Sequence, residues 1–244
     1  MKHALFLVAI LGCGEAKDKP AVETWGVAEF AQAGLRIDRP WKPADFTTAA
    51  AVLEAQCKDH RDRLPHFHGP RTGEVFAKLL TPLPDDSAEP ITQRFTAHML
   101  RGEALTAISK LYLVDLLAAP SRDYIEVMGS YFLEASALAE IAAPFLASFG
   151  PDDPKHQTRL EGLARMSHGD ALMLHGGLLI AEDPRLAEAD RLAMLAYVSA
   201  ALPTLLPRAE PAVQQAIRDD LAKQVATTPP GTLHEAFVTA QRKK

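Results

Sequence analysis

Prolines and glycines divide this chain into segments of helical length. The main breaks are LPHFHGPRTG (64–73), TPLPDDSAEP (81–90), GPDDP (150–154) and TTPPG (227–231). Proline inside a helix removes a backbone hydrogen bond and clashes with the preceding turn, so each break should end a helix. The segments between the breaks are rich in alanine and leucine, which favour helix, and aromatic residues are only 7% of the chain, which disfavours sheet. The pattern predicts an all-α protein.

The predicted domain is a set of antiparallel helices joined by short loops, either a helical bundle or an irregular array of helical hairpins. Before the first long helix, residues 24–46 should form an ordered but irregular lead-in whose aromatic and proline residues pack on the domain. Asp45 is a candidate N-cap for the helix that follows. The expected helices cover residues 46–63, 74–80, 91–118, 121–148, 155–182, 184–206 and 211–225, with a short last helix ending near residue 242.

The segment 121–148 has the clearest amphipathic pattern. Its apolar residues alternate at spacings of three and four, which predicts a seam packed against neighbouring helices at a shallow angle. Leu138 lies in the middle of this seam, whereas Glu134 lies on its flank, where replacement by Gln should change stability little. The seam residues are Tyr124, Met128, Tyr131, Ala135, Leu138, Ala142, Phe145 and Phe149.

The first residues have the features of an export signal. A cationic head, Met1-Lys2-His3, precedes an apolar run from Ala4 to Gly12 that is too short to span a bilayer. The run ends in Ile10-Leu11-Gly12-Cys13, which resembles the lipobox of bacterial lipoproteins. The resemblance implies a signal peptide (1–12), a lipidated Cys13 with a polar tether (13–23), and a single helical domain (24–244).

This resemblance places the protein on the bacterial cell envelope, anchored to a membrane by lipid. Gly14, rather than Asp, follows the cysteine, which in this family leans towards the outer membrane of a Gram-negative cell. Two alternatives stay open. Cleavage after Ala16 would give a secreted or periplasmic protein, and a buried N-terminal helix or strand would suit a cytosolic one.

Charge and cysteine content exclude several classes of protein. The net charge is −5, and the one basic cluster is the tail Arg242-Lys243-Lys244, so we expect no nucleic-acid partner. The expected partners are the membrane, through the lipid, and other envelope proteins. The chain has two cysteines, too few for a disulfide scaffold, and Cys57 lies in a helical pattern that predicts burial. No apolar run after Cys13 approaches membrane-spanning length.

Four polar residues, His60, Asp62, His66 and His68, form the densest group of metal-ligand types in the chain. Imidazoles and carboxylates bind zinc or copper. Their spacing matches no metal-binding signature, however, and histidines are also common at the C-terminal end of a helix, where the dipole favours them. We therefore predict no metal site and no cofactor.

Two further histidines, His168 and His175, are seven residues apart in the predicted helix 155–182 and share one face. That face also carries Leu172 and Leu179, so we expect it to be an apolar arc of the helix. His168 and His175 are then either core-edge histidines or the lining of a ligand pocket between helices.

No motif for a serine nucleophile, a phosphate-binding loop or a metalloprotease occurs in the chain. The favoured interpretation is a non-enzymatic, membrane-anchored envelope lipoprotein that acts through protein or envelope contacts. One alternative is a helical ligand- or metal-binding protein that uses His60, His66 and His68 or His168 and His175. A second is a hydrolase whose site is assembled from distant residues.

The lipobox gives the first testable prediction. Cys13→Ser should abolish lipid attachment, because it removes the thiol that would carry the acyl chains. Metabolic labelling with a fatty acid should mark the wild-type protein and leave the variant unlabelled. Equal labelling of both proteins would rule out Cys13 as the anchor.

Overall fold

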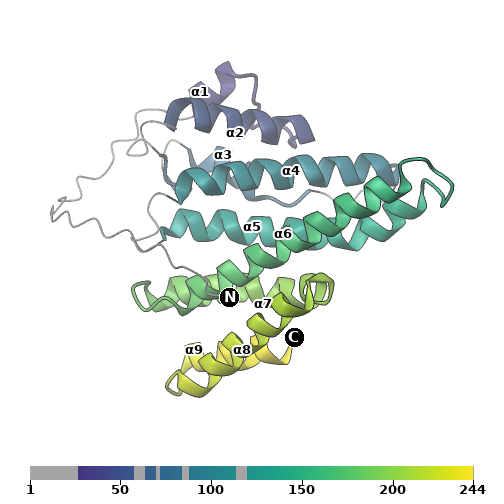
Figure 1. Cartoon of the computed structure of the whole chain (residues 1–244). Helices are drawn as coiled ribbons and strands as arrows, with labels where there is room; N and C mark the ends of the chain where they lie inside the picture. The colour runs from purple at the N-terminus through teal and green to yellow at the C-terminus, as the bar shows by residue number, and fades with distance from the viewer. Residues whose placement is uncertain (1–26, 58–63, 70–71, 84–87, 114–119, 244) are drawn as a thin grey trace, which may run out of the picture.

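The computed structural model describes residues 27–57, 64–69, 72–83, 88–113 and 120–243, and in these ranges every regular element is a helix (Figure 1). This confirms the predicted all-α class. The helices are α1 (Val27–Gln32), α2 (Pro43–Cys57), α3 (Gly73–Leu80), α4 (Ile91–Tyr112), α5 (Arg122–Ala147), α6 (His156–Glu182), α7 (Glu188–Leu205), η2 (Leu206–Arg208), α8 (Pro211–Thr227) and α9 (Thr232–Arg242).

The helices form a layered array rather than a closed ring. α2 packs on α4, α4 on α5, α5 on α7, and α7 on α9, so that consecutive layers run down the molecule in Figure 1. α6 crosses α5 obliquely and packs on α7 and α8. One hydrophobic core runs from Phe30 in α1 to Ala240 in α9. The packing of the described helices against one another agrees with the predicted all-α helical bundle.

The lead-in contains more regular structure than predicted. α1 forms two turns of helix inside it, and α2 begins at Pro43 rather than near Phe46. Asp45 is therefore not the N-cap: it lies at the third helical position and accepts a hydrogen bond from the Lys42 backbone N–H at 2.6 Å. Proline at the first position and an acid reaching back at the third form a recognised helix start. Phe30, Trp41 and Phe46 are buried, as predicted for the lead-in aromatics.

α5 matches its prediction closely. Ser121 caps it by accepting a hydrogen bond from the Tyr124 N–H at 3.1 Å, and the seam residues from Tyr124 to Ala142 are buried. Cys57 is fully buried as well. The placement of Glu134 was wrong, because its side chain is 2% exposed instead of lying on a solvated flank.

Glu134 is buried because it pairs with Arg101 of α4, which is 1% exposed. The His98 Nδ1 atom lies 2.6 Å from Oε1 of Glu134. The Arg101 guanidinium also donates to the carbonyl oxygens of Leu79 and Leu80, each at 3.2 Å, at the end of α3. It lies 5.4 Å from the Phe46 ring of α2. One charged pair thus connects four helices, α2 to α5.

α7 lies between α5 and α6 on one side and α9 on the other. The stretch Glu188–Arg208 is long and apolar enough to cross a membrane, contrary to the expectation that no such run follows Cys13. Its side chains Met194, Leu195, Val198 and Leu202 are, however, buried against the surrounding helices. A central core helix has the same composition as a membrane span, which accounts for the overlap.

Gly177 allows α6 to approach its neighbours closely. A Cβ atom at this position would lie 2.7 Å from Phe132 of α5 and 3.1 Å from Val198 of α7, and both of those side chains are fully buried. The preceding residue, Gly176, has no atom within 4 Å of its Cβ position. Two adjacent glycines of one helix therefore have opposite environments.

We predict that Gly177→Ala destabilises the fold by about 1–3 kcal/mol, because the added methyl overpacks the core. Gly176→Ala, the matched control, should stabilise it by about 0.5–1 kcal/mol, because alanine is the better helix former. Urea denaturation of both variants would measure the difference. A loss of stability of equal size in the two variants would contradict the close approach at Gly177.

We also predict that Glu134→Gln costs about 3 kcal/mol or more, because it leaves the Arg101 charge buried without a counter-charge. Glu140, which is exposed on the same helix, gives the control: Glu140→Gln should change stability by no more than about 0.5 kcal/mol. Thermal unfolding followed by circular dichroism would test both. An unaffected Glu134→Gln variant would show that the pair contributes nothing to stability.

Candidate ligand-binding cavity

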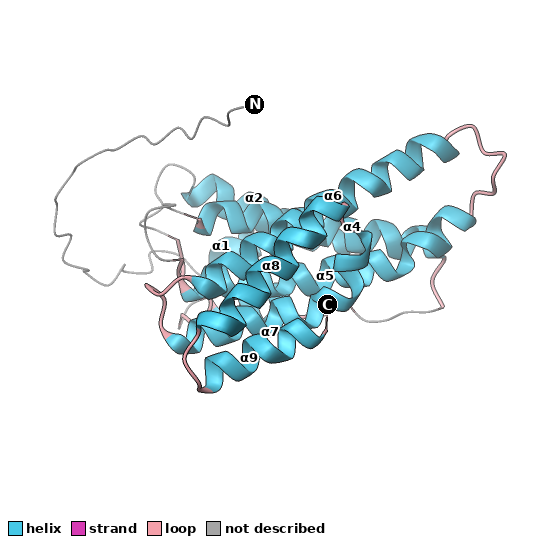
Figure 2. Cartoon of the chain, turned by 60° about the horizontal axis from the view of Figure 1, so that its bottom comes forward, coloured by secondary structure: helices cyan, strands magenta, loops and turns pink. Residues whose placement is uncertain are grey.

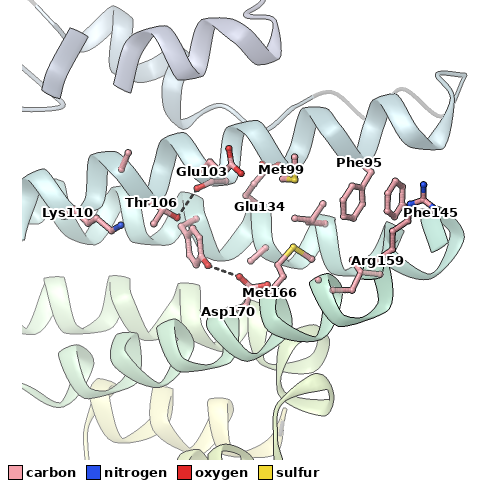
Figure 3. A pocket seen from close by; sticks show the side chains of 17 residues that line it. Phe95, Met99, Glu103, Thr106, Lys110, Glu134, Phe145, Arg159, Met166 and Asp170 are labelled. Carbon is pink, nitrogen blue, oxygen red and sulfur yellow. Dashed lines mark hydrogen bonds between the residues drawn. The ribbon is translucent and has the colours of Figure 1, made fainter. Parts of the chain in front are cut away.

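A cavity of about 630 Å³ lies between α4, α5 and α6 (Figure 3). This volume falls within the range of sites that bind small molecules. α5 packs against both α4 and α6, but α4 and α6 make few direct contacts, since α6 crosses α5 obliquely. The first half of α6 therefore stands away from α4, as Figure 2 shows at the tip of the α5–α6 hairpin.

The hydrophobic clusters reflect this separation. Phe95, Leu138 and Ala142 form a small cluster of their own, apart from the main core, with Leu163 and Met166 of α6 packed on it. The cavity runs along this outer cluster, and its walls are mostly apolar. Two of its side chains are methionines, whose flexible thioethers adapt to irregular shapes. The apolar lining comprises Phe95, Met99, Ala107, Ala135, Leu138, Phe145, Leu163 and Met166.

Aromatic side chains close one end of the cavity. The rings of Phe95 and Phe145 are stacked with centroids 3.8 Å apart, and Phe149 meets Phe145 edge-on at 5.1 Å. The Arg159 guanidinium lies 3.5 Å from the centre of the Phe149 ring and pairs with Asp153 at 2.7 Å. The charge of Arg159 is thus compensated outside the cavity wall.

The opposite end of the cavity is polar. Tyr131 of α5 donates a hydrogen bond from its hydroxyl group to Oδ1 of Asp170 on α6, at 2.6 Å (Figure 3). Asp170 is only 6% exposed, and burial raises the pKa of its carboxyl group above the ordinary value. Burial also raises the pKa of the Tyr131 hydroxyl. Glu103 and Lys110 of α4 line the same end but are exposed to solvent.

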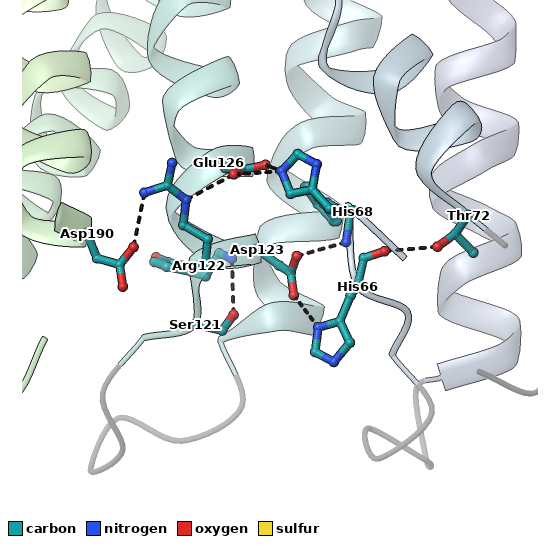
Figure 4. A network of polar contacts seen from close by, with 10 residues as sticks. His66, His68, Thr72, Ser121, Arg122, Asp123, Glu126 and Asp190 are labelled. Carbon is teal, nitrogen blue, oxygen red and sulfur yellow. Dashed lines mark hydrogen bonds and ion pairs between the residues drawn. The ribbon is translucent and has the colours of Figure 1, made fainter. Parts of the chain in front are cut away.

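The predicted metal candidates lie elsewhere. His66 Nδ1 lies 2.9 Å from Asp123 Oδ2, and His68 Nε2 lies 2.9 Å from Glu126 Oε2, at the start of α5 (Figure 4). Both imidazoles remain largely exposed, with side-chain exposures of 66% and 75%. The other two candidates, His60 and Asp62, lie outside the described residues. Within the described ranges, no group of three or more His, Cys, Asp or Glu side chains is placed to hold a metal ion.

The loop that carries His66 and His68 also contacts α5 through its backbone. Asp123 also accepts a hydrogen bond from the Phe67 backbone N–H at 2.8 Å. Arg122 pairs with both Glu126 and Asp190, at 3.0 Å each, which links the same end of α5 to the start of α7. Sequence reasoning treated His66 and His68 as loop histidines and did not anticipate these carboxylate partners 57 and 58 residues away.

The predicted histidine face of α6 does not line the cavity. His175 Nε2 lies 2.7 Å from Asp220 Oδ2 of α8, and His168 Nδ1 lies 3.3 Å from Glu210, the N-cap residue of α8. The expectation of an apolar arc here was wrong, because Leu172 and Leu179 are 48% and 50% exposed. The buried face of α6 instead consists of Asp170, Ala171, Leu174, Gly177, Leu178 and Ala181.

Sequence reasoning thus missed the cavity and its polar end. One signal was present: Asp170 falls in register with Leu163, Met166, Leu174, Leu178 and Ala181, as a single acid on an otherwise apolar and small-residue face. A carboxylate at such a position needs a partner or an unusual environment. Its partner, Tyr131, lies on the α5 seam, which the sequence did predict to be buried.

Comparisons with known proteins found no match, whether among family models, curated proteins or solved structures.

Proposed function

We propose that this protein is a lipid-anchored bacterial envelope protein that binds a small, mostly apolar molecule in the cavity between α4, α5 and α6. The observation that carries the proposal is the cavity itself, with apolar walls, one aromatic end and one polar end. Small-molecule sites combine an apolar lining with a few placed polar groups in this manner. Binding without catalysis is the activity that we assign to it.

The shape of the cavity favours a long, narrow ligand. The lining residues on α4 extend from Phe95 to Lys110. At the rise per residue of an α-helix, these residues span a length of about 22 Å. A volume of about 630 Å³ over that length corresponds to a cross-section of about 30 Å², enough for a single alkyl chain. A single-chain amphiphile would lay its chain along Met99, Leu138 and Met166 and its head group near Asp170.

The location follows from the lipobox-like sequence that ends in Cys13, which lies outside the described residues. An acylated Cys13 and the tether to residue 23 would hold the cavity close to a membrane, where single-chain amphiphiles are concentrated. Acyl chains contribute about 0.8 kcal/mol for each buried CH₂, so an anchor of more than one chain would give stable attachment. Anchor and cavity would then serve one purpose: capture of an amphiphile at the envelope.

A cavity-filling substitution tests the proposal. Gly162 lines the cavity and has no atom within 4 Å of its Cβ position, so Gly162→Phe should place a ring in the open space. We predict that this variant binds decanol at least about tenfold more weakly than its parent. Isothermal titration calorimetry on the full chain carrying Cys13→Ser, which needs no detergent, gives the affinity.

The matched control is Gly176→Phe, on the same helix and equally open at Cβ but outside the cavity. It should leave decanol affinity within about threefold of the parent. Decanol binding that survives Gly162→Phe would place the ligand somewhere else. A parent protein that binds no alkyl compound would overturn the proposed function.

A further inference from the structure

The charges that line the cavity largely cancel. Glu134 is neutralised by Arg101 and contacted by His98, and Arg159 pairs with Asp153. Glu103 and Lys110 are exposed on one face of α4, seven residues apart and opposite in sign. Exposed charges of this kind are screened by water and salt.

Asp170 is the exception among the charged residues that line the cavity. Its carboxyl group is buried, lines the cavity and receives the Tyr131 hydroxyl hydrogen bond on Oδ1. Among the described residues, no Lys, Arg or His forms an ion pair with it. A buried carboxylate is costly unless it is paired and hydrogen-bonded. Among the described residues, Asp170 is therefore a buried acid of the cavity lining without a cationic partner.

We propose that the cavity selects a cationic amphiphile, a primary ammonium group on an alkyl body, with Asp170 as its counter-ion. This inference deepens the proposed function and rests on it. The alkyl body would occupy the apolar lining, and the ammonium group would donate to the Asp170 carboxylate while Tyr131 holds that carboxylate in position. Tyr131 is a positioning residue, because it acts on the ligand through Asp170.

The alternatives fit the site less well. A fatty acid would bring a second carboxylate beside Asp170, and two like charges in a buried site repel each other strongly. A neutral alcohol would form a hydrogen bond there but would leave Asp170 without a counter-charge. An ammonium group forms a charge-assisted hydrogen bond, which is roughly twice as strong as a neutral one.

Binding of an ammonium group should be linked to protons. Burial raises the pKa of the Asp170 carboxyl group, so the empty protein takes up a proton here at a higher pH than an exposed aspartate would. An adjacent ammonium group favours the charged carboxylate, so binding in that acidic pH range should release a proton. The other groups around this end are Glu103 and Lys110 on α4, Tyr131 and Glu134 on α5, and Arg159 further along α6. Ammonium affinity should therefore rise with pH as Asp170 ionises, at a higher pH than an ordinary aspartate would.

The test compares decylammonium, decanol and decanoate, which share one chain and differ in head group. Isothermal titration calorimetry uses the full chain carrying Cys13→Ser. We expect decylammonium to bind at least about tenfold more tightly than decanol, and decanoate to bind most weakly. Repeating the decylammonium titration over a range of pH, in buffers of different ionisation enthalpy, should reveal the pH dependence of the affinity and the proton release.

Asp170→Asn removes the charge but keeps a carbonyl oxygen that can accept from the Tyr131 hydroxyl. This variant should bind decylammonium and decanol equally, with decanol affinity within about threefold of the parent. The control, Glu140→Gln, removes an exposed acid of α5 outside the cavity lining and should keep the ammonium preference. Proton release in the parent protein provides a measurement that does not depend on how well the Asp170 variant folds.

The outcomes separate the two proposals. If decanol binds the parent protein as tightly as decylammonium, or decanoate binds most tightly, the cavity binds amphiphiles but the cation preference is overturned. Decylammonium affinity that does not rise with pH, or an unchanged preference in Asp170→Asn, would also overturn it. If none of the three compounds binds, the proposed function fails together with this inference.

Discussion

The buried pair of Arg101 and Glu134 is the interaction on which the upper half of this molecule depends. Removing two charges from water is costly, and the cost is offset only when hydrogen bonds satisfy the remaining donors and acceptors. Here the Leu79 and Leu80 carbonyl oxygens accept hydrogen bonds from the guanidinium and His98 contacts the carboxylate, whereas the buried Arg101 Nε has no hydrogen-bond partner among the described residues. The end of α3 and the register of α4 against α5 are thereby set together, because a shift of either helix would separate the pair.

That constraint also defines one wall of the cavity. Glu134 is part of this wall, but its carboxylate is paired with Arg101. The wall therefore has no unpaired charge at this position. Leu138 follows one turn later and belongs to the outer cluster with Phe95 and Ala142. α5 thus has a charged, tightly packed section beside α4 and a more loosely covered apolar section beyond it. The cavity occupies the boundary between these two sections.

The sequence predicted the fold class, the helix order and the buried seam of α5, because Ser121 and the regular apolar spacing of that helix agree with its packing. It did not predict the partners of Glu134, His66 or His68, which lie 33 to 58 residues away in the chain. Helical periodicity indicates which face of a helix is apolar. It does not indicate which side chain, distant in the sequence, pairs with a buried polar side chain.

α6 shows where periodicity fails altogether. Leucines occur on more than one side of this helix: Leu174 and Leu178 are buried, whereas Leu172 and Leu179 are exposed. From the sequence, a buried face containing Leu172, His175 and Leu179 was therefore as plausible as the buried face observed in the structure. Gly177 lies on the buried side, and the absence of a side chain there allows α6 to pack closely against Phe132 and Val198. The Asp170 end of the cavity could not be found without that orientation.

The separation of the two hydrophobic clusters has a consequence for the dynamics of the molecule. The end of the α5–α6 hairpin is held by three buried side chains, Phe95, Leu138 and Ala142, and not by the main core. Stability within a protein is distributed unevenly, and a region with few buried contacts opens at a lower free energy than the whole. The hairpin end is thus a separate unit of local unfolding, and its backbone amides should exchange with solvent well before those of α7. Because this unit contains the aromatic end of the cavity, its local opening would widen the cavity at that end.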